Sequence, residues 1–234
     1  MTSIAANLQA VRARIAAACV AAGRPLDAAQ LLAVSKTWPA ASVREAAAAG
    51  QRAFGENYVQ EAVGKAAELA ADLAAPKLDW HFIGPLQSNK TRAVAEHFAW
   101  VHSVDRLKIA ERLAAQRPPG MPPLQACIQV NVSGEASKSG CAPDQAAALA
   151  HAVAALPGLR LRGLMAIPEP GDDNRLQRSR FALLRQLRDR LNAEGLRLDT
   201  LSMGMSEDLE AAIMEGATIV RVGTAIFGKR DYTT

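Results

Sequence analysis

The chain has 234 residues, of which half are hydrophobic and 21% are charged, enough to bury a large core in one or two α/β domains. The net charge is +4, and the arginines of residues 178–190 are interspersed with acidic residues. That mixture indicates a solvated helix face and argues against nucleic-acid binding. Three cysteines without a CxxC pair argue against a disulfide framework and a metal site. We find no signal sequence and no membrane-length apolar run, so we expect a soluble, cytoplasmic protein.

The first predicted element is an amphipathic helix over residues 3–22, which Gly23 and Pro25 end. After it, short apolar runs alternate with helical patterns. Strands are predicted at residues 30–35, 52–55, 78–83, 100–103, 124–131, 159–167, 200–203 and 218–222. Helices are predicted at residues 39–49, 56–71, 173–194 and 207–215, and from about residues 88, 105 and 143.

Eight strands that alternate with helical patterns predict parallel strands joined by right-handed crossovers. At this chain length they predict an α/β fold with a closed (β/α)₈ barrel of the TIM type. An open, doubly wound sheet is the alternative, because periodicity does not detect closure. We find no linker, and we interpret the proline-rich residues 117–124 as a loop. We therefore expect one domain over residues 1–234, with the helix of residues 1–25 packed on the barrel.

Polar and glycine residues follow the predicted strands, where a barrel of this type builds its active face. The first strand is followed by Lys36 and the second by Asn57; Met165 lies in the sixth, Ser202, Met203 and Gly204 end the seventh, and Arg221, Gly223 and Thr224 end the eighth. Such barrels often bind phosphate at the glycine-rich ends of their last two strands, with backbone N–H groups and the start of a short helix.

Lys36 directly follows an apolar strand, so we expect its ammonium group to be partly desolvated at the barrel mouth. Burial lowers the pKa of a lysine, and a neutral amine can attack an aldehyde. A ligand that carries both an aldehyde and a phosphate would explain this lysine and the glycine-rich strand ends together. The alternative is an ordinary solvated lysine on a loop.

Seven motifs occur in order between residues 31 and 228: AVSKTWP, FGENYVQE, WHFIGPLQSNK, VHSVDR, EASKSG, GLMAIP and LSMGMSEDLEAAIMEGATIVRVGTAIFG. Together they resemble the YggS/PROSC family of pyridoxal phosphate homeostasis proteins. The resemblance implies a fold-type III barrel, similar to the N-terminal domain of bacterial alanine racemase, with pyridoxal 5'-phosphate as cofactor. One position departs from the family: Trp38 stands where a second basic residue is common.

The resemblance also implies a role for each candidate residue. Lys36 would form the Schiff base, Arg221 would face the pyridine nitrogen, and Asn57 and Met165 would line the ring, with His81 and Ile83 farther down the wall. Ser202, Gly223 and Thr224, with backbone amides around Met203 and Gly204, would hold the phosphate. Alternative interpretations are an ion pair for Arg221, core packing for Met165 and His81, and a simple turn at Gly223.

Racemisation needs a second acid–base group opposite the lysine. In alanine racemase this group is a tyrosine from the C-terminal domain of a partner subunit, whereas this chain has only Tyr58 and Tyr232 and ends soon after the eighth strand. We therefore expect no catalytic residue and a monomeric carrier that delivers its cofactor to pyridoxal phosphate-dependent apoenzymes. A weak racemase or related enzyme is the first alternative, and an RNA- or protein-binding module is the second. A weaker second cofactor site on a surface lysine such as Lys138 has no residue evidence.

Overall fold

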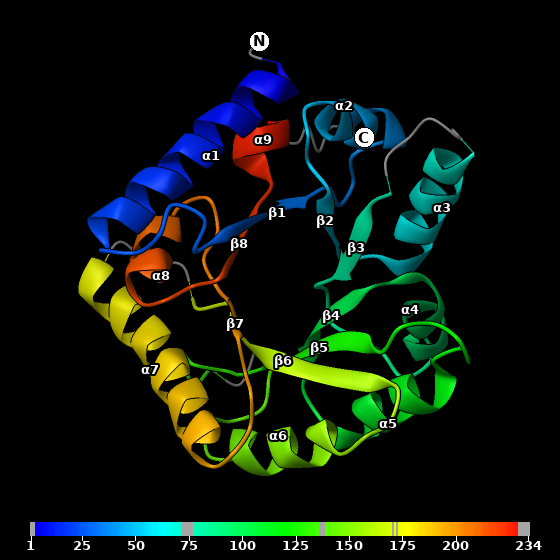
Figure 1. Cartoon of the computed structure of the whole chain (residues 1–234), viewed down its shortest axis with the longest axis vertical. Helices are drawn as coiled ribbons and strands as arrows, with labels where there is room; N and C mark the ends of the chain where they lie inside the picture. The colour runs from blue at the N-terminus through cyan, green and yellow to red at the C-terminus, as the bar shows by residue number, and fades with distance from the viewer. Residues whose placement is uncertain (1–2, 72–76, 136–138, 170, 172, 229–234) are drawn as a thin grey trace.

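A closed barrel of eight parallel strands lies at the centre of the computed structural model, which describes residues 3–71, 77–135, 139–169, 171 and 173–228 (Figure 1). Lys138 and Tyr232 lie outside these described residues. The strands are β1 (Gln30–Val34), β2 (Ala53–Glu56), β3 (Asp79–Phe82), β4 (Trp100–Val104), β5 (Leu124–Gln129), β6 (Leu159–Met165), β7 (Thr200–Ser202) and β8 (Ile219–Val222).

Helices surround the barrel on its outside (Figure 1). They are α1 (Ile4–Ala21), α2 (Ala40–Ala48), α3 (Val59–Ala70), α4 (Thr91–His97), α5 (Leu107–Gln116), α6 (Ala146–Ala154), α7 (Asn174–Ala193), α8 (Leu209–Met214) and α9 (Thr224–Phe227). Local signals set some of their ends. The Asp173 side chain caps α7 by accepting from two backbone amides, and Gly195, with φ of 101°, follows its C-terminal end.

Strand pairing confirms the predicted (β/α)₈ barrel and excludes the open sheet. In β1, Ala33 pairs with Phe54 of β2 and also with Val222 of β8, so the first and last strands close the ring. Alternation along β1 separates two apolar layers. Ala33 joins the large cluster between the barrel and the helices, whereas Leu32 and Val34 pack in a small separate cluster with Ile83 and Ile219.

The N-terminal helix α1 packs on the outside of the barrel, beside α8 and α9 (Figure 1). The side chain of Asn7 donates to the carbonyl of Ile226 at 2.9 Å, and Leu8, Val11 and Ile15 are buried. By length and mean hydropathy alone, α1 could cross a membrane. The expectation that no apolar run reaches membrane-spanning length was therefore wrong by this criterion. In this fold, its apolar stripe contacts other helices.

Helix α3 begins three residues later than its sequence pattern predicts. Glu56 completes β2, and Tyr58 is extended, with φ of −119° and ψ of 113°. Asn57 therefore remains in the loop after β2 instead of entering a helix. This short extended segment brings Asn57 to the carboxyl end of the barrel, next to the turn that carries Lys36.

Candidate functional site

All nine predicted site residues lie at the carboxyl ends of five neighbouring strands. Around the barrel these strands follow the order β6, β7, β8, β1 and β2. Met165 pairs with Ser202, and the Arg221 amide donates to the Gly204 carbonyl at 2.9 Å. Strand β1 pairs with β8 on one side and with β2 on the other. Lys36, which follows β1, therefore lies between the carboxyl ends of β8 and β2. One continuous arc of the rim thus contains the complete predicted set.

Lys36 lies at the corner of a tight turn directly after β1. The Trp38 amide donates to the Ser35 carbonyl at 3.0 Å, which closes the turn. Thr37 has φ of 67°, a left-handed conformation that costs a β-branched residue about 1–2 kcal/mol. Lys36 itself is half-buried, as expected for a lysine at the barrel mouth.

A buried network behind this turn was not predicted from the sequence. Lys65 of α3 donates to Glu56 Oε1 at 2.8 Å, to the Ser35 carbonyl at 2.7 Å and to Glu61 Oε1 at 2.6 Å. Burial raises the pKa of the Glu56 carboxyl, while hydrogen bonds from Lys65 and Ser35 oppose that rise. The four-residue spacing of Glu61 and Lys65 was the available signal, because it places both on one face of a helix.

Arg221 is buried inside the barrel with 3% of its surface exposed. Its guanidinium donates to the Ser202 carbonyl at 2.6 Å, to Ser202 Oγ at 2.8 Å and to the Ala166 carbonyl at 2.8 Å. Burial lowers the pKa of Arg221 to about 10, so the group is still charged at neutral pH. Within the described part of the chain, no carboxylate forms an ion pair with it, which argues against the alternative of a rim ion pair.

Two buried histidines extend the hydrogen-bonded network of Arg221 and Ser202 across the barrel. His102 Nδ1 lies 2.8 Å from Ser202 Oγ, and His102 Nε2 lies 2.9 Å from His81 Nδ1. Burial lowers the pKa of His81 to about 3 and that of His102 well below its ordinary value. The contacts are satisfied when Ser202, which accepts from Arg221, donates to His102 Nδ1, and His102 Nε2–H donates to His81. Both rings are then neutral.

The predicted phosphate-binding residues divide into two groups. Ser202 and Met203 are already engaged: the Ser202 hydroxyl bonds to Arg221 and His102, and the Met203 amide donates to the Ile219 carbonyl at 3.1 Å. Gly204 and Gly223 lie at positions where neighbouring atoms leave little room for a side chain. Gly204 has φ of 93°, and a Cβ on Gly223 would lie 3.0 Å from the carbonyl oxygen of Val34. Thr224 is exposed and begins α9.

The two residues predicted to line a ligand ring lie on opposite sides of Lys36 along the rim. Met165 is fully buried at the end of β6. Asn57 Oδ1 is buried and accepts no hydrogen bond from any described residue. Gly84, after β3, permits this arrangement, since its Cβ would lie 2.5 Å from the Asn57 carbonyl oxygen. A buried polar atom without a partner is unusual and indicates a position where a ligand donor can bind.

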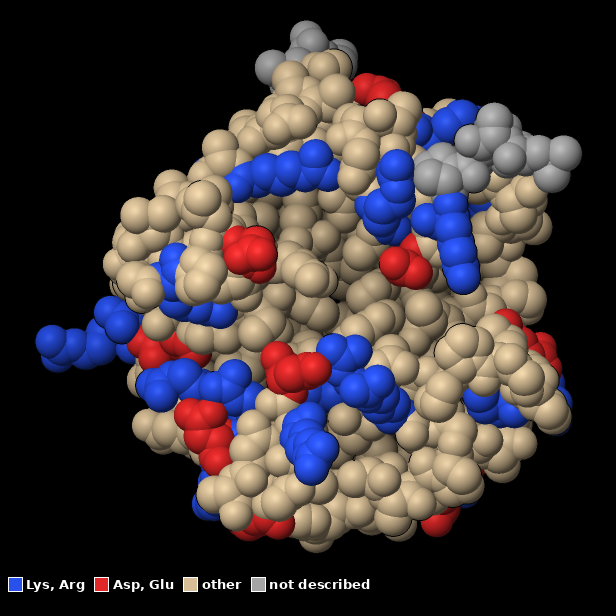
Figure 2. Space-filling model, viewed as in Figure 1, with Lys and Arg blue, Asp and Glu red and all other residues tan. Residues whose placement is uncertain are grey.

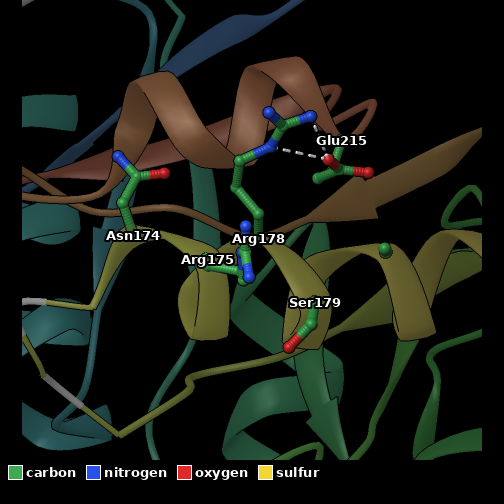
Figure 3. Close-up of a pocket in the computed structure, with 6 residues that line it drawn as sticks. Asn174, Arg175, Arg178, Ser179 and Glu215 are labelled. Atoms are coloured by element: carbon green, nitrogen blue, oxygen red, sulfur yellow. Dashed lines mark hydrogen bonds and ion pairs between the residues drawn. The ribbon is translucent and has the colours of Figure 1, made fainter.

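A surface pocket of about 350 Å³ lies outside the barrel, between α7 and α8 (Figure 3). Asn174, Arg175, Arg178 and Ser179 line it from α7, and Arg178 points to Glu215 and pairs with it at 2.7 Å. Because Arg178 is already paired with Glu215, it is not available to bind an anion in this pocket. It shares no residue with the rim.

Charge and metal-ligand patterns add no further site. On the face drawn in Figure 2, positive and negative side chains are interspersed around the hollowed centre, without a continuous basic stripe. Throughout the described ranges, no three His, Cys, Asp or Glu side chains lie close enough together to hold a metal ion.

Comparison with known proteins gives matches along nearly the whole chain. The family model for the N-terminal domain of alanine racemase matches residues 6–231. A Pseudomonas aeruginosa protein named pyridoxal phosphate homeostasis protein is 68% identical over 99% of this chain and 98% of its own length. An Escherichia coli protein of the same name is 54% identical over all of this chain and 99% of its own length.

Solved structures agree with the fold. PipY of Synechococcus elongatus, solved with pyridoxal phosphate bound, is 42% identical, with a TM-score of 0.85 over 97% of this chain and all of its own. Alanine racemase from Corynebacterium glutamicum has a TM-score of 0.68 at 16% identity, over 97% of this chain and 62% of its own. At that identity, the racemase shows a shared fold alone.

Proposed function

Because the chain belongs to the alanine racemase N-terminal domain family, and within it to the YggS/PROSC group of pyridoxal phosphate homeostasis proteins, we propose that it binds pyridoxal 5'-phosphate as a reversible Schiff base on Lys36. Its function would be to store this cofactor and deliver it to apoenzymes. The observation that carries the proposal is the position of Lys36 at the corner of a rim turn, in the same arc as Arg221 and the two glycines.

The described residues fit this cofactor in three respects. Asn57 Oδ1 is a buried acceptor to which no described residue donates, so it would be available to a ligand donor. Arg221 supplies a buried positive charge that forms no ion pair with a described carboxylate. Gly223 precedes the short helix α9, and the first N–H groups of that helix, which have no partner within the helix, would be available to a phosphate.

We assign the phosphate to Gly204, Gly223 and Thr224 and give Ser202 a different role from the one that the resemblance implies. The Ser202 hydroxyl is bonded to Arg221 and His102, so it orients the guanidinium. The Met203 amide already donates to the Ile219 carbonyl, so it is not available to a phosphate, which would contact neighbouring atoms of this segment instead. Met165 and Asn57 would contact the ring.

The cofactor supplies an aldehyde for reversible capture and a phosphate for anchoring. Lys36 would act as the nucleophile toward that aldehyde, with release of one water molecule, and hydrolysis would reverse the capture without an oxidant or reductant. Arg221 is protonated near neutral pH and disfavours a proton on a facing pyridine nitrogen. The ring is then a poor electron sink, which favours storage over carbanion chemistry.

The carrier role also agrees with the names of the relatives, which refer to homeostasis and not to catalysis. Tyr58, the tyrosine among the described residues, is 56% exposed at the start of α3. We propose a cytoplasmic monomer whose partners are apoenzymes. A weak amino-acid racemase is the second candidate, because the fold is shared with alanine racemase.

Reduction with borohydride tests the proposal directly. Wild-type protein with added pyridoxal 5'-phosphate should show a visible absorption band that borohydride abolishes, and peptide mass analysis should find the reduced adduct on Lys36. Lys36→Ala should lose both signals, whereas Lys108→Ala, a control at an exposed lysine on α5, should retain them. A wild-type protein without this band would refute the proposed Schiff base.

Two further assays separate a carrier from an enzyme. Loaded protein should transfer cofactor to an apoenzyme faster than passive release allows, and should not exchange the α-proton of alanine for deuterium. Exchange that depends on Lys36 would instead support the racemase alternative.

A further inference from the structure

Lys65 binds the backbone immediately before Lys36. Its side chain is 7% exposed, and its ammonium donates to the Ser35 carbonyl at 2.7 Å and to Glu56 Oε1 at 2.8 Å. The Ser35 hydroxyl donates to the same carboxylate oxygen at 2.7 Å. Lys65 therefore connects the end of β1, the end of β2 and helix α3.

Glu61 binds the backbone immediately after Lys36. Its Oε1 accepts from the Thr37 amide at 2.5 Å and from Lys65 Nζ at 2.6 Å. Glu61 and Lys65 are four residues apart on α3, so both side chains extend from the same face of this helix. The two peptide units that flank Lys36 are thus held by one ion pair.

The turn that this pair holds is strained. Of the residues that the structure describes, Thr37 is the one non-glycine residue with positive φ, and the Ser35–Trp38 hydrogen bond closes the turn around Lys36. A strained local conformation persists when surrounding contacts hold it, and it is characteristic of functional sites. The hydrogen bonds of Lys65 and Glu61 are contacts of this kind.

We infer that Lys65 and Glu61 are positioning residues for Lys36, and that they hold this turn so that the Lys36 side chain leaves the backbone in one fixed direction. The inference rests on the proposed Schiff base at Lys36. A lysine side chain has several rotatable bonds, so a fixed backbone reduces the conformations that compete with attack on a bound aldehyde. The phosphate anchor on β7 and β8 does not include these residues. Loss of the pair should therefore impair imine formation and leave anchoring intact.

Two probes separate these steps. Pyridoxal 5'-phosphate can form the imine, whereas pyridoxine 5'-phosphate has an alcohol in place of the aldehyde and can only be anchored. We would measure the rate at which the imine band appears with the first probe and the dissociation constant of the second. The variants are Lys65→Met and Glu61→Ala in the full chain. The control is Glu68→Gln, elsewhere on α3, which breaks an exposed ion pair with Arg44 of α2.

Both variants should form the imine about tenfold more slowly or worse, since small misplacements of a reacting group have large effects on rate. The dissociation constant for pyridoxine 5'-phosphate should change less than about twofold, and Glu68→Gln should match the wild type. Unchanged imine rates, or equal losses with both probes, would overturn the inference.

The remaining outcomes are also decisive. Glu61 is 29% exposed, so Glu61→Ala provides the test even if Lys65→Met, at a buried position, does not fold. Lys65→Arg retains the positive charge and should recover part of the rate of imine formation. If Lys65 had a purely structural role, this recovery would not be confined to the imine band. If wild-type protein itself forms no imine, the proposed function fails, and this result is distinct from a failure confined to the variants.

Discussion

Trp38 stacks on Phe227, with ring centroids 5.9 Å apart and 28° between the ring planes. Trp38 lies two residues after Lys36, and Phe227 ends α9, the helix that follows β8. The contact thus connects the turn that carries the proposed Schiff-base lysine to the segment proposed to bind phosphate. Trp38, the residue that departs from the motif in the sequence, is therefore used here for aromatic packing.

Trp38→Ala should reduce the free energy of unfolding by about 2 kcal/mol, because the half-buried Trp38 ring loses its contact with buried Phe227. It should also weaken pyridoxal 5'-phosphate binding, since α9 loses its contact with the Lys36 turn. Urea unfolding and cofactor titration measure the two effects. Trp38→Phe retains a ring against Phe227 and should remain within about 1 kcal/mol of wild type. Equal stability of Trp38→Ala and wild type would contradict this account.

Ser202→Ala should reduce the free energy of unfolding by about 1–3 kcal/mol, because Arg221 loses a buried acceptor and His102 loses its Nδ1 partner. Urea unfolding of the protein without cofactor is the appropriate measurement. The matched control is Ser179→Ala on α7, where the exposed hydroxyl only donates to its own helix, and a change within about 0.5 kcal/mol is expected. If both variants lose the same free energy of unfolding, the hydrogen bonds of Ser202 with Arg221 and His102 do not stabilise the barrel.

Stability should fall as pH decreases below about 6.5, because His81 and His102 are held neutral in the fold but take up protons in the unfolded chain. The unfolded state then binds more protons. Between about pH 6.5 and its lowered folded pKa, each histidine reduces the free energy of unfolding by up to about 1.4 kcal/mol for each pH unit of acidification. Above this range it has no effect on the pH dependence of stability. Urea unfolding between pH 7.5 and 5 measures the slope.

The variant His102→Gln isolates the share of one histidine, since its amide can still bond to Ser202. Its stability should depend less on pH than that of wild type over the same range. Burial raises the pKa of Glu56, which acts in the opposite direction, but Glu56 is present in both proteins and its effect cancels in the comparison. Identical slopes for the two proteins would show that His102 is not held neutral.

Gly163→Ala should destabilise the protein by about 3 kcal/mol or more, because its Cβ would lie 1.8 Å from the Thr200 carbonyl oxygen. The change would separate β6 from β7, the strands that carry Met165 and Ser202. Gly64→Ala, inside α3, is the control: its Cβ would contact nothing within 4 Å, and it should stabilise the helix by about 1 kcal/mol. Thermal or urea unfolding would show the opposite signs, and a tolerated Gly163→Ala would contradict the described strand contact.

The alternation of strand and helix patterns predicted the order and type of the elements, because both periodicities are local properties of the chain. Boundaries were less accurate at α3, where Glu56 remains in β2 and Tyr58 stays extended. Closure was inferred from the strand count. It depends on the pairing of residues near position 33 with residues near position 222, which no local pattern contains.

The positions of the candidate site residues followed from one general rule, that strand ends share a rim, together with the family resemblance. Their partners did not. The resemblance assigns Ser202 to the phosphate, and only the fold shows that its hydroxyl lies between Arg221 and His102, a residue 100 positions away in the chain. Lys65 was not singled out at all, although it holds the backbone before Lys36.

The sequence by itself determined the strand-and-helix order and the presence of Lys36 at a strand end, since each depends on residues close together in the chain. The tertiary structure decided which groups surround Lys36 and Arg221, because burial and hydrogen bonding join segments that are distant in sequence. Trp38 illustrates the difference. The sequence showed only that this residue departs from a motif, and the fold placed its ring against Phe227.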